Sequence, residues 1–390
     1  MKILFTVGSC LEINNSANFC HIAYIRGAVE AGHDVDVISM SSKGCLTDDT
    51  IALPEVSNMY VYDAPAINES SSSVRKLSKL LSPEIKAKLK NIFYHSDSIY
   101  GKTAETWISR ASAFKSDVRY DAVISLATPY SGHLLASILI GNKNVITDRW
   151  IQIWEDPWSA DLYVAKGNDD IRREEARLLS LADEIFYVSP LTLKYQKELF
   201  PESSDKMKWH PLPYYYRNSD VSTNDSSDKV FGYFGDYYSF SRDIKPLYGA
   251  ASMNGTKLKI IGNTDLKLEN TETVTVKPRI GLGELKTEED KTDVLVFLSN
   301  LKGGQIPGKL YQYSATEKPI LFILDGTDEE KHILRQTFEK YGRYVFCDNT
   351  EGSISEAMKM IKSGVFEGIC NECVDEFSPL NTINGILGAI

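Results

Sequence analysis

The sequence predicts an α/β protein made of two successive Rossmann-like halves. Near the N-terminus, the apolar run at 2–7 predicts a buried strand, and a helix over 17–31 and a second strand over 34–39 follow it. Gly32 stands where this helix is expected to end, as a C-terminal glycine does. Strand, helix, glycine turn and strand form a unit that builds a parallel sheet covered by helices. The same order recurs later in the chain and starts again after the polar stretch at 217–229.

The first half continues with the same alternation of short apolar runs and helical patterns. Strands are expected at 121–126 (DAVISL) and 144–148 (NVITD), with a helix at 132–140 between them. An amphipathic pattern predicts a helix over 172–182, and the run at 184–188 (EIFYV) predicts one more strand. We expect these strands to lie in one parallel sheet.

Residues 217–229 (RNSDVSTNDSSDK) are small and polar and lack apolar periodicity, which is typical of a linker. Beyond them, strands are expected at 230–234, 258–261, 274–276, 293–298 and 320–323. The helices expected there lie at 243–252, 308–315, 327–340 and 353–363. We therefore expect a first domain at 1–216, a linker at 217–229, a second domain at 230–374, and a last helix at 375–390 that packs back on the first domain.

Composition and charge exclude several functional classes. The chain has 390 residues, with 43 Lys and Arg against 53 Asp and Glu, so its formal charge is −10. Such a chain lacks the broad positive field that nucleic-acid binding needs, so nucleic acid is not an expected partner. No run approaches the roughly 18 apolar residues of a membrane-spanning helix.

The N-terminal run and the six cysteines favour the cytoplasm. The apolar part of MKILFTVGSC is too short for an export signal, and the cysteines are therefore expected to be reduced thiols. Cys370 and Cys373 form a CxxC pair, but neither a second pair nor a histidine at zinc-site spacing accompanies it. The six histidines are scattered and are each interpreted as structural, so no metal site is expected.

The segment at 75–90 (RKLSKLLSPEIKAKLK) is locally basic in an acidic chain. It carries six Lys or Arg against one Glu, and its leucines recur at helical spacing on both sides of Pro83. One interpretation is peripheral contact with the anionic inner face of a membrane. The alternative is a solvated helix whose lysine stems cover apolar neighbours in the first domain.

Two loops after strands of the first half carry candidate binding residues. Gly8 and Ser9 follow the first strand, where backbone N–H groups beside a helix N-terminus suit an anion. A plain tight turn explains the same residues equally well.

The stretch 148–158 interleaves carboxylates with tryptophans. Carboxylates hydrogen-bond sugar hydroxyls and aromatic faces pack against sugar rings, so this loop favours a carbohydrate site. The alternative places the tryptophans in the core and makes the carboxylates helix caps. The residues concerned are Asp148, Glu155, Asp156, Trp150, Trp154 and Trp158.

A glycine-rich loop enters a predicted helix at Pro307–Gly308. Lys309 lies in the first turn of that helix, and Gln312 follows three residues later. A helix N-terminus with a lysine suits a diphosphate, and a polar side chain one turn on reaches sugar hydroxyls.

The run IPGKLYQYSATEKPIL (306–321) resembles the signature of family 4 glycosyltransferases, which often read Pro-x-Lys-Leu-Phe-Glu-Tyr followed by Lys-Pro-Val-Leu. Other pieces resemble the family, including its bacterial polysaccharide transferases, in the expected order. They are Gly32–His33 with DVDVIS, YDAVISLATPYSGHLLA (120–136), WIQIWEDPWSAD (150–161), LADEIFYVSPLTLKYQ (181–196) and FGYFGDYY (231–238). The resemblance covers most of the chain except 45–115.

This resemblance implies a GT-B fold, with two Rossmann-like domains facing a central cleft. It also implies transfer of a sugar, with retention, from a nucleotide-diphosphate sugar to a glycan, lipid-linked or protein-linked acceptor, with no metal or other cofactor required. The residues expected to bind the donor are Gly235, Arg242, Lys245, Lys309 and Gln312. The residues expected to bind the acceptor are Gly8, Ser9, Asp148, Trp154, Glu155 and Trp158, with Asp156 as the candidate that orients it.

The family's Glu-x7-Glu pair is absent from this chain. Gln312 stands at the second position, and the first falls near Gly304. A glutamine still hydrogen-bonds ribose hydroxyls, without the charge of a carboxylate. Two alternatives therefore stay open: a nucleotide-sugar epimerase of GT-B fold, and a non-catalytic sugar- or partner-binding protein.

Overall fold

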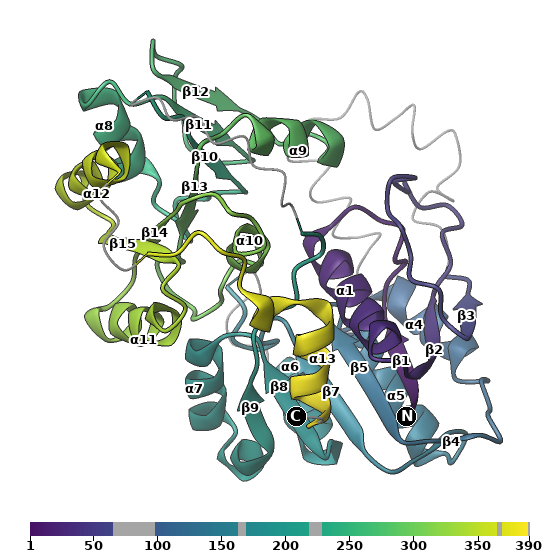
Figure 1. Cartoon of the computed structure of the whole chain (residues 1–390). Helices are drawn as coiled ribbons and strands as arrows, with labels where there is room; N and C mark the ends of the chain where they lie inside the picture. The colour runs from purple at the N-terminus through teal and green to yellow at the C-terminus, as the bar shows by residue number, and fades with distance from the viewer. Residues whose placement is uncertain (65–97, 163–168, 218–227, 365–368, 389–390) are drawn as a thin grey trace, which may run out of the picture. The chain divides into compact units, whose positions relative to one another are not determined.

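The computed structural model describes residues 1–64, 98–162, 169–217, 228–364 and 369–388 (Figure 1). The chain forms two compact units. The first unit contains Met1–Tyr187, Gln196–His210 and Ile383–Ile390, and the second contains Val188–Tyr195 and Pro211–Thr382. The basic segment 75–90 and residues 218–227 of the expected linker lie outside the described residues.

The first unit is built on a seven-stranded sheet in the order β3-β2-β1-β5-β7-β8-β9, and every neighbouring pair is parallel. Its strands are β1 (Lys2–Val7), β2 (Asp34–Met40), β3 (Asn58–Tyr62), β5 (Ala122–Ala127), β7 (Trp150–Trp154), β8 (Glu184–Tyr187) and β9 (Met207–Trp209). Two further short strands, β4 (Arg119–Tyr120) and β6 (Ile146–Thr147), pair with each other in a separate small sheet.

Helices cover the first unit's sheet. The described helices are α1 (Ser16–Glu30), α4 (Lys102–Ala111), α5 (Ser131–Gly141), α6 (Asp169–Leu181) and the single-turn η1 (Pro201–Lys206), while α7 (Pro190–Leu199) is divided between the two units. Helix α5 contacts β1 and β5 and touches both α4 and α6, whereas α1 packs against β2 (Figure 1). Asn15 caps α1 by accepting from the backbone N–H of Asn18, and Gly32 after its end has φ +77°, a value that favours glycine.

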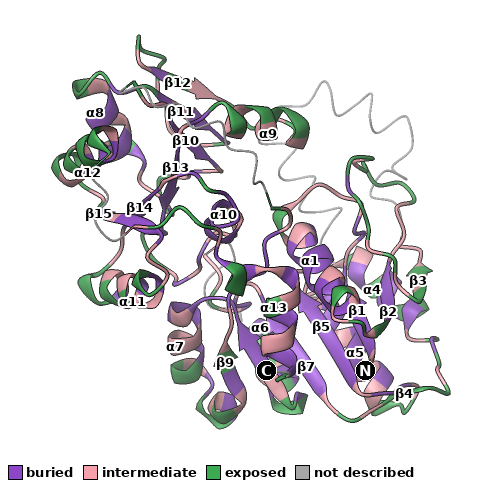
Figure 2. Ribbon diagram, viewed as in Figure 1, coloured by how far each residue is buried: buried purple, intermediate pink, exposed green. Residues whose placement is uncertain are grey.

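One strand of the first half was predicted in the wrong place. The run at 144–148 gives only the two residues of β6, and the main sheet instead continues with β7, which was expected to be part of a binding loop. All five residues of β7 are buried (Figure 2). A strand buried on both faces shows no alternation of polar and apolar residues, and tryptophans in it are core residues.

The second unit is built on a six-stranded sheet in the order β12-β11-β10-β13-β14-β15, again with all neighbours parallel. Its strands are β10 (Phe231–Phe234), β11 (Leu258–Ile261), β12 (Val274–Lys277), β13 (Val294–Leu298), β14 (Ile320–Leu324) and β15 (Tyr344–Asp348). Its helices are α8 (Lys245–Met253), α9 (Leu282–Asp290), α10 (Lys309–Tyr313), α11 (Asp328–Glu339), α12 (Glu351–Ser363) and the single-turn η2 (Asp375–Phe377), and α13 (Pro379–Leu387) is divided between the units.

The second unit has one continuous core. Helices α8 and α12 pack against each other, and their apolar faces join side chains from β10, β11, β13, β14 and β15. Figure 2 shows the inner strands β10, β13 and β14 of this sheet as buried. The prediction of two successive Rossmann-like halves is confirmed.

The strand order has one reversal in each unit. In both sheets the chain first builds outward in one direction and then crosses back to the other side of its first strand. The reversal falls between β1 and β5 in the first unit and between β10 and β13 in the second. In open parallel sheets, ligands bind beyond the carboxyl ends of the strands at this reversal. Among the described residues, no helix is long and apolar enough to cross a membrane.

Candidate functional site

The loop after β10 leaves the second unit's sheet at the strand reversal. Gly235 follows β10 directly, and its N–H donates to the Ile261 carbonyl at 2.9 Å. Gly262, at the end of the neighbouring β11, lies against it. A Cβ on Gly262 would be 1.9 Å from the Gly235 carbonyl oxygen, so the two loops need a glycine here to approach so closely.

Arg242 joins the two loops that flank the reversal. Its Nε donates to Asn300 Oδ1 at 2.8 Å, in the loop after β13, and its Nη1 donates to the Asp236 carbonyl at 2.5 Å, in the loop after β10. A guanidinium has five N–H donors, so this geometry fixes the group and leaves donors for a ligand. Lys245 is the first residue of α8, close by in sequence. The structure therefore places the Arg242 guanidinium at the reversal, and donor binding by Arg242 and Lys245 stays a prediction.

Lys309 begins α10, and its charge is paired within the second unit. Its Nζ lies 2.7 Å from Glu289 Oε1 and 5.6 Å from the centre of the Tyr313 ring. Glu289 also accepts from the Tyr216 hydroxyl at 3.1 Å. Burial and this carboxylate both raise the pKa of Tyr216, which stays protonated and donates. A diphosphate bound by Lys309 has to share the ammonium with Glu289.

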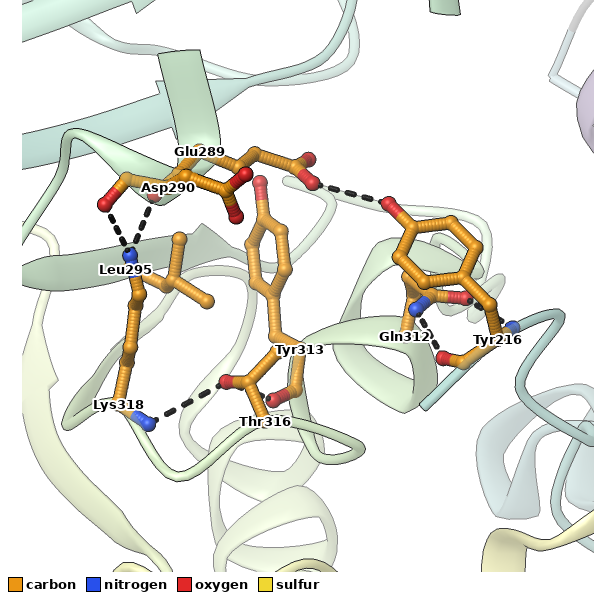
Figure 3. Close-up of a pocket in the computed structure, with 8 residues that line it drawn as sticks. All are labelled: Tyr216, Glu289, Asp290, Leu295, Gln312, Tyr313, Thr316 and Lys318. Carbon is orange, nitrogen blue, oxygen red and sulfur yellow. Dashed lines mark hydrogen bonds between the residues drawn. The ribbon is translucent and has the colours of Figure 1, made fainter. Parts of the chain in front are cut away.

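The Gln312 side chain holds the backbone of residues 215–216. Its Oε1 accepts from the N–H of Tyr215 at 3.0 Å and of Tyr216 at 3.4 Å, and its Nε2 donates to the Tyr216 carbonyl at 2.7 Å. Figure 3 shows this contact beside a cavity of about 10 Å³, which is about the room one water molecule needs. The lining residues are Tyr216, Glu289, Asp290, Leu295, Gln312, Tyr313, Thr316 and Lys318. Ribose binding by Gln312 stays a prediction, and the structure adds this second role.

Gly304 stands where the resemblance expects the first glutamate, in a backbone conformation that favours glycine. Its φ is +73°, and a Cβ there would lie 3.0 Å from two ring carbons of Tyr195. Its carbonyl accepts from the hydroxyls of Ser189 at 2.5 Å and Thr192 at 3.1 Å. A residue with a side chain at this position would have to adopt an unfavourable left-handed backbone conformation, and its Cβ would crowd the Tyr195 ring.

In the first unit, Gly8 and Ser9 are engaged by protein contacts. A Cβ on Gly8 would be 2.2 Å from Ser131 Oγ, so glycine lets the end of β1 pass close to the start of α5. The Ser9 hydroxyl donates to Asn18 Oδ1 at 2.6 Å. Close packing therefore accounts for Gly8, and its anion-binding role stays a prediction.

The expected cluster of acids and tryptophans does not assemble as one loop. Asp148 precedes β7 and pairs with Arg119, whereas Glu155 and Asp156 follow β7. At about 3.3 Å per residue, the strand separates Asp148 from the two other acids by about 20 Å. Asp148 therefore lies at the opposite end of the strand from the carboxyl edge where ligands bind.

Trp154 and Trp158 are core residues, which corrects their expected role as sugar-stacking rings. Their exposed fractions are 0% and 3%. The Tyr130 ring stacks on Trp158 with centroids 4.5 Å apart, and His133 lies 4.4 Å from Trp154. Because neighbouring rings cover their faces, the alternative of structural tryptophans holds in this unit.

Glu155 instead belongs to a buried polar cluster at the carboxyl edge of the first unit. Its Oε1 lies 3.3 Å from Nε2 of His21 on α1. Burial, together with Asp156, raises the pKa of Glu155 well above its usual range. Burial lowers the pKa of His21 to about 3 and that of His133, whose Nδ1 lies 2.7 Å from Ser125 Oγ, also to about 3.

This cluster was not expected from the sequence, which gave each histidine a structural role. In the described part of the chain, two ring nitrogens of this cluster, His21 Nδ1 and His133 Nε2, are buried without a hydrogen-bond partner. Groups with strongly shifted pKa values, such as Glu155, His21 and His133, cluster at functional sites. No sequence spacing joins His21 to Glu155, because only the sheet order brings α1 beside the end of β7. The described residues contain no group of three His, Cys, Asp or Glu that could hold a metal ion.

No protein-family model matches the chain, and no curated protein matches its sequence. Solved structures do match. Sucrose-phosphate synthase from Thermosynechococcus elongatus matches with a TM-score of 0.60 at 11% identity, over 100% of this chain and 96% of that one. A glycosyltransferase from Rickettsia africae matches with a TM-score of 0.54 at 10% identity, over 100% and 97%. The chain has the GT-B fold.

A third structure with this fold has another activity. The UDP-GlcNAc 2-epimerase from Methanocaldococcus jannaschii matches with a TM-score of 0.50 at 10% identity, over 100% of this chain and 99% of that one. At these identities the likeness establishes the GT-B fold alone.

Proposed function

We propose that this chain is a glycosyltransferase, which moves a sugar from a nucleotide-diphosphate sugar to a glycan, lipid-linked or protein-linked acceptor with retention. The observation that supports it best is the Arg242 guanidinium, fixed by Asn300 and the Asp236 carbonyl at the strand reversal of a GT-B chain. An immobilised cation at this edge suits a diphosphate, because no ordering of the side chain is needed when the ligand arrives.

In this transfer, the bond between the sugar's anomeric carbon and the diphosphate oxygen breaks as the acceptor oxygen bonds to that carbon. The acceptor proton passes to the leaving diphosphate. Arg242, Lys245 and Lys309 offset the negative charge that develops on the leaving group. Asp156 orients the acceptor, and no protein residue becomes covalently attached.

Replacing Arg242 by glutamine tests the donor half of this proposal. We expect Arg242→Gln to weaken binding of the cognate nucleoside diphosphate by about 1.5–3 kcal/mol, the range for a hydrogen bond to a charged group. Calorimetry after a thermal-shift screen of UDP, GDP, dTDP and ADP measures this loss. Arg335→Gln is the matched control, because Arg335 lies on α11 over the Phe346 ring, 5.1 Å from its centre. Equal affinity in all three proteins removes Arg242 from the site.

Turnover with and without an acceptor separates the three possible functions. A transferase gives a glycosylated product only when an acceptor is present, and NMR of its anomeric proton reports retention. An epimerase changes the nucleotide sugar without any acceptor. A protein that binds the nucleotide sugar but converts it under neither condition is a binding module, and that result contradicts the proposal.

A further inference from the structure

The proposed function assigns no role to the two thiols of the CxxC pair in the second unit. Cys370 is exposed and Cys373 is half-buried, and both are free thiols. We propose that Cys370 and Cys373 form a thiol–disulfide exchange site, which closes to a disulfide by reaction with a low-molecular-weight disulfide of the glutathione class. This inference is independent of the proposed function.

The segment that carries the two thiols is fixed at both of its ends. The N–H of Cys370 donates to the Gly342 carbonyl at 2.7 Å, and the N–H of Val374 donates to the Ser314 carbonyl at 2.9 Å. Both acceptors belong to the second unit. The folded chain therefore already restricts the backbone on either side of the pair, which lowers the conformational entropy lost when a disulfide closes.

The backbone bends between the two thiols. Glu372 lies in this bend, and its N–H donates to Cys370 Sγ at 3.3 Å. The Cys370 side chain therefore lies over the bend that leads to Cys373. A backbone N–H in this position also stabilises negative charge on the sulfur, and the thiolate is the form that attacks a disulfide.

A buried guanidinium adjoins the same segment. Arg343 is 1% exposed, and its Nη1 donates at 3.4 Å to Oδ1 of Asn371, which stands between the two cysteines. Within the described ranges, its Nε is buried without a hydrogen-bond partner. Burial lowers the pKa of Arg343, and negative charge on Tyr344, Cys373 and Cys370 opposes this shift. Charge on either sulfur therefore offsets part of the cost of burying this cation.

A second guanidinium faces Cys373. The charge of Cys373 and a hydrogen bond to its sulfur raise the pKa of Arg217. Arg217 Nη1 also lies 3.5 Å from Asp375 Oδ1, so this carboxylate shares the cation. Both side chains of that ion pair are at least half exposed, and solvent therefore weakens it. Arg217 is thus placed to stabilise a thiolate at Cys373 during the exchange.

The exchange proceeds in two balanced steps. The more exposed Cys370 thiolate attacks one sulfur of oxidised glutathione, the S–S bond breaks, and one glutathione thiolate leaves. The Cys373 thiolate then attacks Cys370 Sγ, displaces the second glutathione thiolate and closes the disulfide. The protons of the two cysteines pass to the two released thiolates. The chain is oxidised by two electrons, and the small disulfide is reduced to two thiols.

Peptide mass spectrometry of the full chain tests this inference. Reduced protein is incubated with oxidised glutathione at neutral pH, quenched with acid and alkylated with N-ethylmaleimide. We expect a disulfide between Cys370 and Cys373 that opens again when reduced glutathione is added. Cys373→Ser should instead hold glutathione on Cys370 as a stable mixed disulfide. Cys45→Ser, at an exposed thiol of the first unit, is the control and should leave the reaction unchanged.

The lifetime of the mixed disulfide tests the role of Arg217. Because the arginine stabilises the attacking Cys373 thiolate, Arg217→Gln should lengthen this lifetime by about 2- to 5-fold. Arg173→Gln, at an exposed arginine of α6 in the first unit, is the matched control and should give the wild-type lifetime. Equal lifetimes in all three proteins remove Arg217 from the site.

Several results would overturn the exchange site itself. One is alkylation of both Cys370 and Cys373 after long incubation, in a sample where Cys45 carries glutathione. Another is a wild-type mixed disulfide at Cys370 that is never displaced by Cys373. A disulfide that forms only after urea has unfolded the chain also overturns it, because the fold then contributes nothing. These measurements use no nucleotide or sugar, so failure of the proposed function leaves them unaffected.

Discussion

His133 shows how the burial of a single residue can make the stability of the fold depend on pH. Ser125 Oγ accepts from Trp150 Nε1 at 2.8 Å and lies 2.7 Å from His133 Nδ1. Ser125 Oγ therefore joins the indole of Trp150 and the imidazole of His133 in one buried hydrogen-bond network. Burial lowers the pKa of His133 to about 3. The folded protein consequently keeps this ring neutral at pH values where an exposed histidine is charged.

This shift predicts acid sensitivity of the first unit. In the unfolded chain a histidine binds a proton below about pH 6.5, whereas His133 in the folded protein stays neutral down to about pH 3. The contribution of the neutral histidine to the free energy of unfolding is therefore fully present above about pH 6.5. It falls as the pH drops towards 3, by about 1.4 kcal/mol per pH unit for each such histidine. Urea unfolding at pH 7, 6, 5 and 4.5 measures the slope. His133→Gln should reduce it by about this amount, and His332→Gln, at an exposed position on α11, should leave it unchanged. A wild-type slope in His133→Gln would mean that the histidine is not buried.

The failure to predict β7 as a strand of the main sheet can also be traced to single residues. Gln152 interrupts the apolar run of β7, yet it is fully buried, because Nε2 donates to the Leu178 carbonyl at 2.8 Å and Oε1 accepts from Trp154 Nε1 at 2.9 Å. A polar residue satisfied by long-range partners cannot be distinguished in sequence from one that faces solvent. By contrast, Arg242 and Lys245 were predicted from their position after a strand, which is a local signal, and their role in donor binding stays a prediction.

At the scale of elements, α10 is a five-residue helix whose Gln312 side chain hydrogen-bonds the backbone of residues 215–216. The amide of Gln312 uses both its oxygen and its nitrogen on the backbone of Tyr215 and Tyr216. The sequence predicted this helix from its turn and periodicity. It gave no signal for α9, which has no buried residue and therefore no apolar stripe.

The hydrogen bonds from Gln312 to the backbone of residues 215–216 predict that a carboxylate cannot replace the amide at position 312 without loss. In Gln312→Glu, one oxygen can still accept from the two N–H groups, but the other replaces a donor and faces the Tyr216 carbonyl. An acceptor left against an acceptor costs about 1–3 kcal/mol. Thermal unfolding measured by circular dichroism should show this loss. Gln336→Glu, at an exposed position on α11, is the comparison and should cost less. If Gln312→Glu is as stable as wild type, the Nε2 bond contributes nothing to the fold.

At the scale of the whole molecule, the chain contributes distant segments to the same unit. Residues Ile383–Ile390 belong to the first unit, although the preceding segment, Pro211–Thr382, belongs to the second. Arg149 Nη2 donates to the Leu387 carbonyl at 2.8 Å, and a Cβ on Gly385 would lie 2.2 Å from His210 Nε2. Sequence patterns located most strands of the two main sheets, since each of these is a local apolar run, but they missed β3, β7, β9 and β15. The sequence also predicted a last helix at 375–390 that packs back on the first domain, and Ile383–Ile390 lie in the first unit.

This division predicts that replacing each of two buried isoleucines, Ile383 and Ile354, destabilises a different unit. Ile383 in α13 and Ile354 in α12 are both 0% exposed, but the first lies in the first unit and the second in the second unit. Ile→Ala at a buried position costs about 2–5 kcal/mol through lost burial and the cavity left behind. Hydrogen exchange read by mass spectrometry should show that Ile383→Ala lowers protection of β7, β8 and β9, because those strands share its unit. Ile354→Ala should lower protection of β10, β13 and β14 instead. If each variant lowers protection in both sheets to the same degree, the two units unfold as one and the regional assignment of α13 is wrong.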